Sequence, residues 1–276
     1  MYCFKDNVIL SIKCNNSGGN VCKFLTKITT NSINLANKSV YACILNSKGR
    51  FLLDLFIYPK SEDFCIIEIH KNFLVKLQEI VELYDIMEEF TTQSLSDYIS
   101  VFSSKIEDTL NNKNAEPKNI AAAKDPRKEN FGMRIICKKD DAEKYLLSQS
   151  DEFNYDKYRI LHCICEGYCD LTPEKSIIME FGFENLNSID FNKGCYPGQE
   201  LITRTKHLLN IKKSVICLPT NLPNELSGAN IKKLQEKLTQ LASANLQSTI
   251  ESESIYNIHP LSRCDELGLY LIAKKY

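Results

Sequence analysis

The sequence predicts an α+β fold in which antiparallel sheets are covered by helices and are followed by a small β-rich C-terminal domain. Two β-rich apolar runs flank a turn-forming tetrapeptide early in the chain, which is typical of a hairpin. Stripes of apolar residues with helical spacing lie before and after them. This order of helix, hairpin, strand and helix favours an antiparallel sheet with helices on one face.

Composition places the chain in the ordinary globular class. Its 276 residues are 43% hydrophobic and 25% charged, which is enough for one large core or two modest ones. The 34 basic and 35 acidic side chains nearly cancel, so nothing indicates a nucleic-acid or membrane-surface protein. No apolar run reaches the ~20 residues of a membrane span. We expect a cytoplasmic protein, or a mitochondrial matrix protein only if a transit peptide has been removed.

The N-terminal third contains the elements of the first predicted sheet. Apolar spacing predicts a short helix near residues 20–30 and an amphipathic helix from Leu74 to Tyr84. The turn residues Asn46-Ser47-Lys48-Gly49 join the two strands of the hairpin. The strands expected here are Val40–Leu45, Phe51–Tyr58 and Phe64–Ile69.

The domain organisation follows from composition shifts. A polar stretch at about 103–130 predicts a mobile connection, with a brief helical turn at Ala121–Ala123 inside it. Residues 1–210 form the main region and residues 211–276 the C-terminal domain. In that domain strands are expected at Ile211–Leu218, Ile255–Ile258 and Leu267–Ala273. A helical stripe at Ile231, Leu234, Leu238 and Leu241 leaves open whether residues 219–254 are a helix or an eroded hairpin.

The centre of the chain is predicted to be mixed. A strand is expected at Met133–Cys137, followed by a helix that begins at Asp140 and another from Tyr155 to Tyr168. His162 falls on the apolar face of this last helix and is expected to be a packed histidine rather than a base.

Twelve cysteines are spread irregularly over the chain, which indicates free thiols in a reducing compartment. Cys163, Cys165 and Cys169 are the only clustered set. A zinc site usually needs a fourth ligand and a second cysteine pair, and neither follows, so we expect no metal site.

The stretch from Phe191 to His207 carries the strongest functional signal. A glycine-bearing loop leads directly into a helix, for which Pro197 is suited as the first residue. Gly194 and Gly198 would let another molecule approach free backbone N–H groups. In this loop Lys193 is expected to stabilise the thiolate of Cys195, although a small buried thiol remains the alternative.

The run from Lys193 to Glu200, followed by Arg204 and His207, resembles the K-G-C-Y/F-x-G-Q-E signature of the YgfZ-type folate-binding proteins. These are relatives of the aminomethyltransferase of glycine cleavage and assist iron–sulfur protein maturation. Further resemblances are Phe24-Leu25-Thr26 with Thr29-Thr30-Asn31, Leu45-Asn46-Ser47-Lys48-Gly49-Arg50, Asp125-Pro126-Arg127 with Gly132-Met133-Arg134, and Ile178-Met179-Glu180. The resemblance implies ferredoxin-like halves in the main region and a reduced β-barrel at the C-terminus.

Asp54 lies within an apolar strand, where a carboxylate is costly without a partner. The resemblance makes it a candidate folate contact. Strand alternation offers a second reading, in which Leu53 and Leu55 face the core and Asp54 faces solvent. The sequence departs from the family at Ile178, where proline is usual, and in the stretch Tyr158–His162, where no acid takes the place of the pteridine-binding glutamate of transferases.

The resemblance implies a folate-binding accessory protein for assembly or repair of 4Fe–4S clusters in radical-SAM and aconitase-type enzymes, including those of tRNA modification. A tetrahydrofolate-dependent aminomethyltransferase is the alternative, and a binding scaffold with an inert cysteine is a third possibility. The implied partners are a reduced folate and iron–sulfur client or carrier proteins, with neither nucleic acid nor membrane. The implied catalytic residues are Cys195 and Lys193, and the implied folate contacts are Asp54, Glu180, Tyr196, Gly198, Gln199, Glu200 and Arg204.

Overall fold

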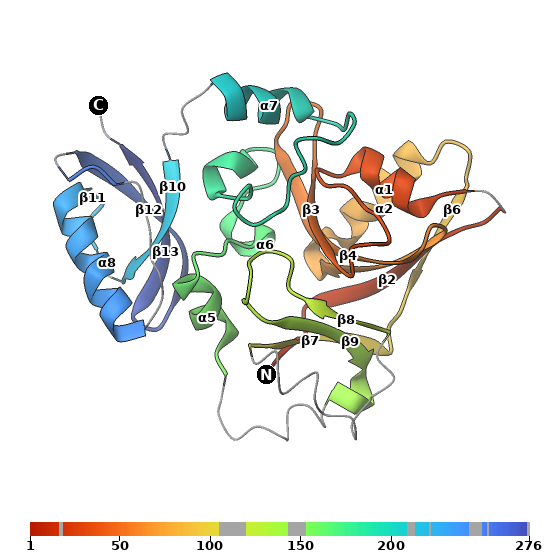
Figure 1. The fold of residues 1–276 in the computed structure, drawn as a ribbon, viewed down its shortest axis with the longest axis horizontal. Helices are drawn as coiled ribbons and strands as arrows, with labels where there is room; N and C mark the ends of the chain where they lie inside the picture. Colours follow the sequence, from red (N-terminus) through yellow and green to blue (C-terminus); the bar gives the residue numbers. More distant parts are fainter. Residues whose placement is uncertain are drawn as a thin grey trace.

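The structure is a computed structural model that describes residues 1–16, 19–104, 120–142, 153–208, 213–220, 222–242, 250–252 and 254–274. Within these residues the strands form three antiparallel sheets with helices packed on them (Figure 1), so the predicted α+β class is confirmed. None of the described helices has the length and apolar character needed to cross a membrane.

The first sheet has five strands and contains the predicted hairpin. Its strand order is β3 (Val40–Leu45), β4 (Phe51–Ser61), β5 (Phe64–His70), β2 (Asn7–Cys14) and β6 (Phe90–Ser94). The Asn46 side chain accepts the N–H groups of Lys48 and Arg50, at 3.0 and 2.9 Å, and so closes the turn between β3 and β4. Strand β2, which lies inside this sheet, was not predicted from the sequence.

Two helices cover this sheet, as the apolar stripes predicted. Helix α1 (Val21–Ile28) packs against β2 and β5, and α2 (Leu74–Tyr84) packs against β4. The Asn20 side chain accepts the N–H of Lys23 at 2.7 Å and caps the start of α1.

A second, four-stranded sheet lies below the first in Figure 1, with the order β1 (Tyr2–Phe4), β7 (Tyr98–Ser103), β9 (Met133–Lys138) and β8 (Ala121–Lys124). The helical turn expected at Ala121–Ala123 is wrong, because these residues pair with β9. Ala121 and Ala123 are buried and Ala122 is exposed, the alternation of a half-buried strand. Residues 120–130 are therefore a strand and a turn rather than a connection, and 105–119 lie outside the described residues.

The segment between the main sheets and the C-terminal sheet consists of short helices. The helix predicted from Tyr155 to Tyr168 is wrong beyond Leu161, since the chain forms α5 (Tyr155–Leu161) and α6 (Gly167–Asp170). Cys163 has φ +56°, a left-handed conformation that ends the first helix. Most of the helix expected from Asp140 lies outside the described residues.

The C-terminal region forms a third sheet with the order β10 (Lys213–Pro219), β13 (Leu267–Lys274), β12 (Ile255–Cys264) and β11 (Glu225–Ser227). Helix α8 (Gly228–Ala242) packs on it through Ile231. Of the two alternatives for residues 219–254, a helix or an eroded hairpin, the structure therefore contains the helix. Helices α5 and α6 contact β12 and join this region to the rest of the molecule. The proposed boundary at 210–211 falls outside the described residues.

Candidate functional site

The predicted signature loop packs against the tip of the β3–β4 hairpin. Gly198 has φ +79°, and a Cβ there would lie 2.5 Å from the carbonyl oxygen of Asn46 and 2.6 Å from the Cα of Gly49. The glycine therefore serves close packing of two backbones rather than ligand approach. Gly194, by contrast, has no atom within 4 Å of an added Cβ.

The helix after the loop is α7 (Gln199–Leu208), which begins two residues later than the sequence predicted. Pro197 lies in the preceding turn, and the side-chain oxygen of Gln199 accepts the N–H of Tyr196 at 3.3 Å. The buried face of α7 is formed by Ile202 and Thr205. Leu208, the last residue of the helix, is 78% exposed.

Lys193 does not act on the cysteine in the way the sequence indicated. Its ammonium donates to the backbone carbonyls of Thr26 and Thr29 at the C-terminal end of α1, and its Nζ lies 4.5 Å from the centre of the Tyr196 ring. Burial lowers the pKa of Lys193 to about 8. The side chain thus ties the loop to α1, where a positive charge suits the helix dipole.

Cys195 is exposed. The alternative of a small buried thiol is therefore wrong for this residue. Its neighbour Tyr196 is buried at 7% exposure, and burial raises the pKa of the tyrosine hydroxyl. The loop therefore exposes the Cys195 thiol to solvent, and the buried ring of Tyr196 holds the loop in place.

The other acidic and basic residues of the signature point elsewhere. Glu180 forms an ion pair with Lys213, at 2.8 Å, and so links the short helix η2 (Ile178–Phe181) to the start of β10. Glu200 and Arg204 are exposed on α7. None of these three lies at the cavity that contains Asp54.

Asp54 points inward from β4, so the solvent-facing alternative is wrong. Its Oδ2 accepts the hydroxyl of Tyr41 at 2.7 Å and the backbone N–H of Gly167 at 3.1 Å. A Cβ at position 167 would lie 2.2 Å from Oδ1, so only glycine fits beside the carboxyl. Burial raises the pKa of Asp54, and these two hydrogen bonds only partly offset that shift.

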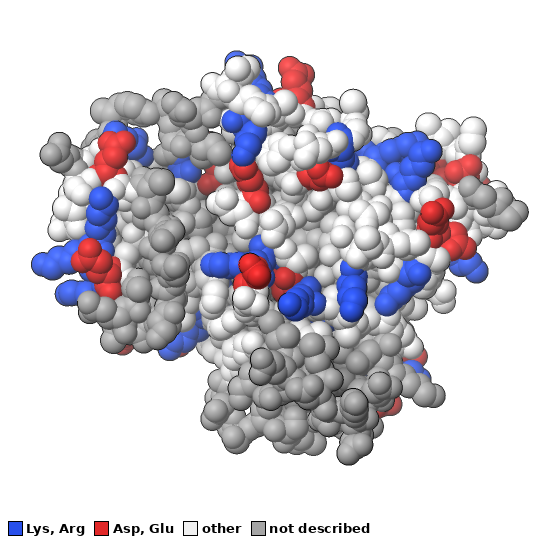
Figure 2. Space-filling view, in the orientation of Figure 1, with Lys and Arg blue, Asp and Glu red and all other residues white. Residues whose placement is uncertain are grey.

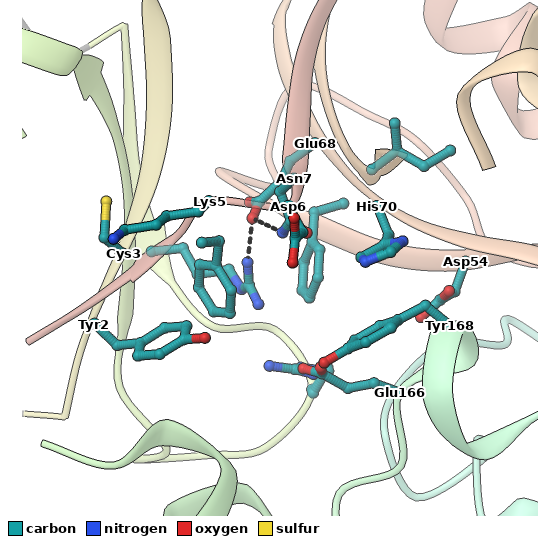
Figure 3. A pocket seen from close by; sticks show the side chains of 15 residues that line it. Tyr2, Cys3, Lys5, Asp6, Asn7, Asp54, Glu68, His70, Glu166 and Tyr168 are labelled. Carbon is teal, nitrogen blue, oxygen red and sulfur yellow. Dashed lines mark hydrogen bonds and ion pairs between the residues drawn. The ribbon is translucent and has the colours of Figure 1, made fainter. Parts of the chain in front are cut away.

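Asp54 lines a cavity of about 330 Å³ between the first and second sheets. In Figure 3 the rings of His70 and Tyr168 lie against each other at one side of the cavity, with Tyr2 opposite. The two rings are parallel within 6° and their centres are 4.1 Å apart. A cavity of this size with aromatic walls and a few polar groups suits a small planar ligand.

The floor of the cavity is a buried network of charged side chains. Arg127 pairs with Asp125 at 2.8 Å and with Glu166 at 2.9 Å, while Arg134 pairs with Glu68 at 2.5 Å and with Asp125 at 3.0 Å. Both guanidinium groups are almost completely buried. Burial alone would raise the pKa of Asp125, but the two arginines outweigh it and lower the pKa to about 2.

The structure thus separates the predicted site residues into two places. Asp54 faces the cavity, whereas the loop from Lys193 to Gln199 lies at the outer tip of the hairpin. Sequence reasoning treated Arg127 and Arg134 only as family resemblances and missed Glu166. The signal that could have found these residues is the presence of a charged residue within an apolar or cysteine-rich segment, since a charge that is buried there must be paired.

His162 packs against aromatic rings, and one of the three clustered cysteines is buried. The ring of His162 packs on Phe131 and Tyr158, and burial lowers its pKa, which confirms a packed histidine. Cys165 is buried. Among the residues that the structure describes, no three or more histidine, cysteine or acidic side chains are placed to hold a metal ion together.

Comparison with known proteins identifies relatives of the chain. It is 28% identical over 206 residues to the mitochondrial iron–sulfur cluster assembly factor IBA57 homolog of Pyricularia oryzae, covering 72% of this chain and 53% of the relative. It is 27% identical over 235 residues to mitochondrial IBA57 of Mus musculus, covering 77% and 65%. The chain therefore spans between half and two thirds of the length of these relatives. No protein-family profile matches it.

Among solved structures, the chain is similar to aminomethyltransferase T of the glycine cleavage system from Bartonella henselae. The TM-score is 0.57 at 12% identity, and the similarity covers 99% of this chain and 77% of the other. This likeness establishes the fold.

Proposed function

Because the chain is a homologue of the IBA57 iron–sulfur cluster assembly factors and has the fold of aminomethyltransferase T, we propose that it is a folate-binding accessory protein for iron–sulfur cluster assembly. Its role would be the assembly or repair of 4Fe–4S clusters in client enzymes of the radical-SAM and aconitase types. Since the relatives are named as mitochondrial, the proposed compartment is the mitochondrial matrix rather than the cytoplasm.

The placement of Asp54 is the observation that carries this proposal. Its carboxyl is fixed by Tyr41 and Gly167 at the wall of the cavity, with Glu166 nearby. A reduced pterin ring carries several N–H donors, and carboxyl oxygens are strong acceptors for them. Glu166 follows closely on the stretch Tyr158–His162, which lacks the transferase glutamate, and it brings a carboxylate to the same cavity.

Cys195 has a separate role in this proposal. It stands on the surface, away from the cavity, where a client or carrier protein can reach it. A one-carbon transferase would need only the cavity. The accessory role proposed here uses both places, so the exposed thiol supports it over the transferase.

A deletion strain complemented with variants tests the proposal. Loss of the chain is expected to lower aconitase activity and radical-SAM tRNA methylthiolation while glycine cleavage stays normal. Asp54→Ala and Cys195→Ala should each fail to restore these activities, whereas Asp97→Ala, which changes an exposed aspartate on another surface, should restore them. Loss of glycine cleavage with normal aconitase activity would instead establish the transferase alternative.

A further inference from the structure

One segment of the chain, α2 with the turn that follows it, concentrates exposed apolar side chains. Of the nine large hydrophobic side chains that are exposed among the described residues, five lie between positions 75 and 87. The most exposed are Ile86 at 88% and Met87 at 80%, in the turn that follows α2. The remaining three are Val75, Leu83 and Tyr84. Apolar surface gathered in this way is typical of an interaction site.

This turn forms one wall of an open groove of about 1260 Å³, which we call the α1 groove. The opposite wall is α1, through Lys23, Phe24 and Lys27, and the floor includes Phe90. The rings of Phe24 and Phe90 stack with centres 4.5 Å apart, so the floor is preformed. Gly194 and Cys195 lie at the edge of the groove.

The two walls differ in charge. Lys23 and Lys27 are exposed one helical turn apart on α1, and neither has a carboxylate partner among the residues that the structure describes. Figure 2 shows both basic and acidic side chains over the end of the molecule that carries α1. On the other wall, the carboxylate of Asp85 is occupied by the N–H groups of Glu89 and Phe90, at 2.8 and 2.9 Å. Glu89 also lines the groove on that side, so the positive charge of the groove is confined to the α1 wall.

We propose that the α1 groove docks an amphipathic segment of a partner protein. The apolar edge of that segment packs on Ile86 and Met87, and its carboxylates face Lys23 and Lys27. The docked segment ends beside Cys195, so the groove directs the partner toward the exposed thiol. This inference rests on the proposed function and adds to it the chemistry of the partner.

The same surface is poorly suited to a membrane. Glu82 and Glu88 are exposed beside the apolar turn, where anionic headgroups would meet them, whereas the carboxylates of a docked segment face the α1 wall. The apolar residues also line a concave groove together with Phe24 and Phe90, whereas a bilayer favours a protruding face. An extended or helical protein segment fits this shape.

Peptide binding to the full chain tests the proposal. The probes are two fluorescein-labelled amphipathic peptides with leucine on one face and either glutamate or lysine on the other. The glutamate peptide should bind at least about tenfold more tightly, which is about 1.4 kcal/mol. With a terminal chloroacetyl group, it should alkylate Cys195 before any other cysteine, as identified by mass spectrometry.

Matched variants locate the site. Lys23→Glu with Lys27→Glu should reverse the preference between the peptides, and Ile86→Ser with Met87→Ser should weaken both. Lys233→Glu with Lys237→Glu has the same spacing on the exposed face of α8 and should change nothing. Circular dichroism verifies the fold of each variant.

Equal binding of the two peptides, or binding unchanged in the α1 variants, would overturn the proposal. Binding of the protein to phosphatidylserine vesicles in preference to the glutamate peptide would also overturn it and assign the surface to membranes. These readouts involve neither folate nor a cluster. If the peptides do not bind as expected but the chain is needed for client maturation, the groove proposal fails and the proposed function stands. If the peptides bind as expected but deletion of the chain does not affect client maturation, the proposed function fails and the groove proposal stands.

Discussion

Gly198 and Gly49 touch through their backbones, so that neither position has room for a side chain. A Cβ on Gly198 would lie 2.6 Å from the Cα of Gly49, and one on Gly49 would lie 2.9 Å from the carbonyl oxygen of Gly198. Both residues have positive φ, at +79° and +74°. The signature loop is therefore fixed to the same hairpin that positions Asp54 farther along β4.

Gly198→Ala is expected to lower the free energy of unfolding by about 1–3 kcal/mol, because it combines a strained φ with a clash against the hairpin. Gly194→Ala is the matched control, since its Cβ would meet nothing within 4 Å, and should change stability by less than about 0.5 kcal/mol. Urea denaturation followed by circular dichroism measures both values. Equal effects of the two substitutions would show that the loop does not depend on this contact.

Cys195 should be the first of the twelve cysteines to react with iodoacetamide near neutral pH. Cys169 is also exposed, but burial of its sulfur together with Asp170 raises the pKa of that thiol. Mass-spectrometric labelling rates rank the cysteines. A rank for Cys195 in the slower half would remove the argument for any chemical role of this thiol.

Asp125 should make the protein sensitive to acid. Its pKa is about 2 in the folded state, below its ordinary value of 3.8, so its contribution is complete above pH ~4 and is lost as the pH falls through about 2. The expected contribution is about 2 kcal/mol. Urea denaturation at a series of pH values in this range should show a steep fall in the free energy of unfolding of the native chain. The control variant Asp97→Asn, which removes an exposed carboxylate, should show the same fall.

Asp125→Asn should remove this pH dependence and destabilise the protein at neutral pH by about 3 kcal/mol, because Arg127 and Arg134 lose a shared buried partner. If the variant keeps the same slope of stability against pH as the native chain, another carboxylate is responsible.

Local patterns predicted the elements whose signals are local. The hairpin, β5, α1 and α2 were identified within a few residues, since each has its own turn, cap or apolar stripe. Strand β8 was mistaken for a helical turn because three alanines favour a helix in isolation. Strand β8 instead pairs with β9, and this pairing overrides the helical preference. The spacing of residues within β8 does not reveal which strand it pairs with.

The orientation of Asp54 shows why the site was harder to predict than the fold. Strand alternation assumes one solvated face, but β4 is covered on both faces: Leu53 and Leu55 are fully buried on one, and Phe56 is buried at 7% exposure on the other. Family resemblance placed Asp54 and the signature loop at one site. Only the three-dimensional packing reveals that the loop lies at the hairpin tip while Arg127 and Glu166 join Asp54 at the cavity.

Titration calorimetry with tetrahydrofolate and with oxidised folate tests the central claim most directly. Tetrahydrofolate should bind the native chain more tightly, because its reduced ring brings additional N–H donors to Asp54. Asp54→Ala should weaken tetrahydrofolate binding by at least about tenfold, or about 1.4 kcal/mol, and Asp97→Ala should leave it unchanged. An affinity of Asp54→Ala within about twofold of the native value, under ~0.5 kcal/mol, would contradict a folate site at this cavity.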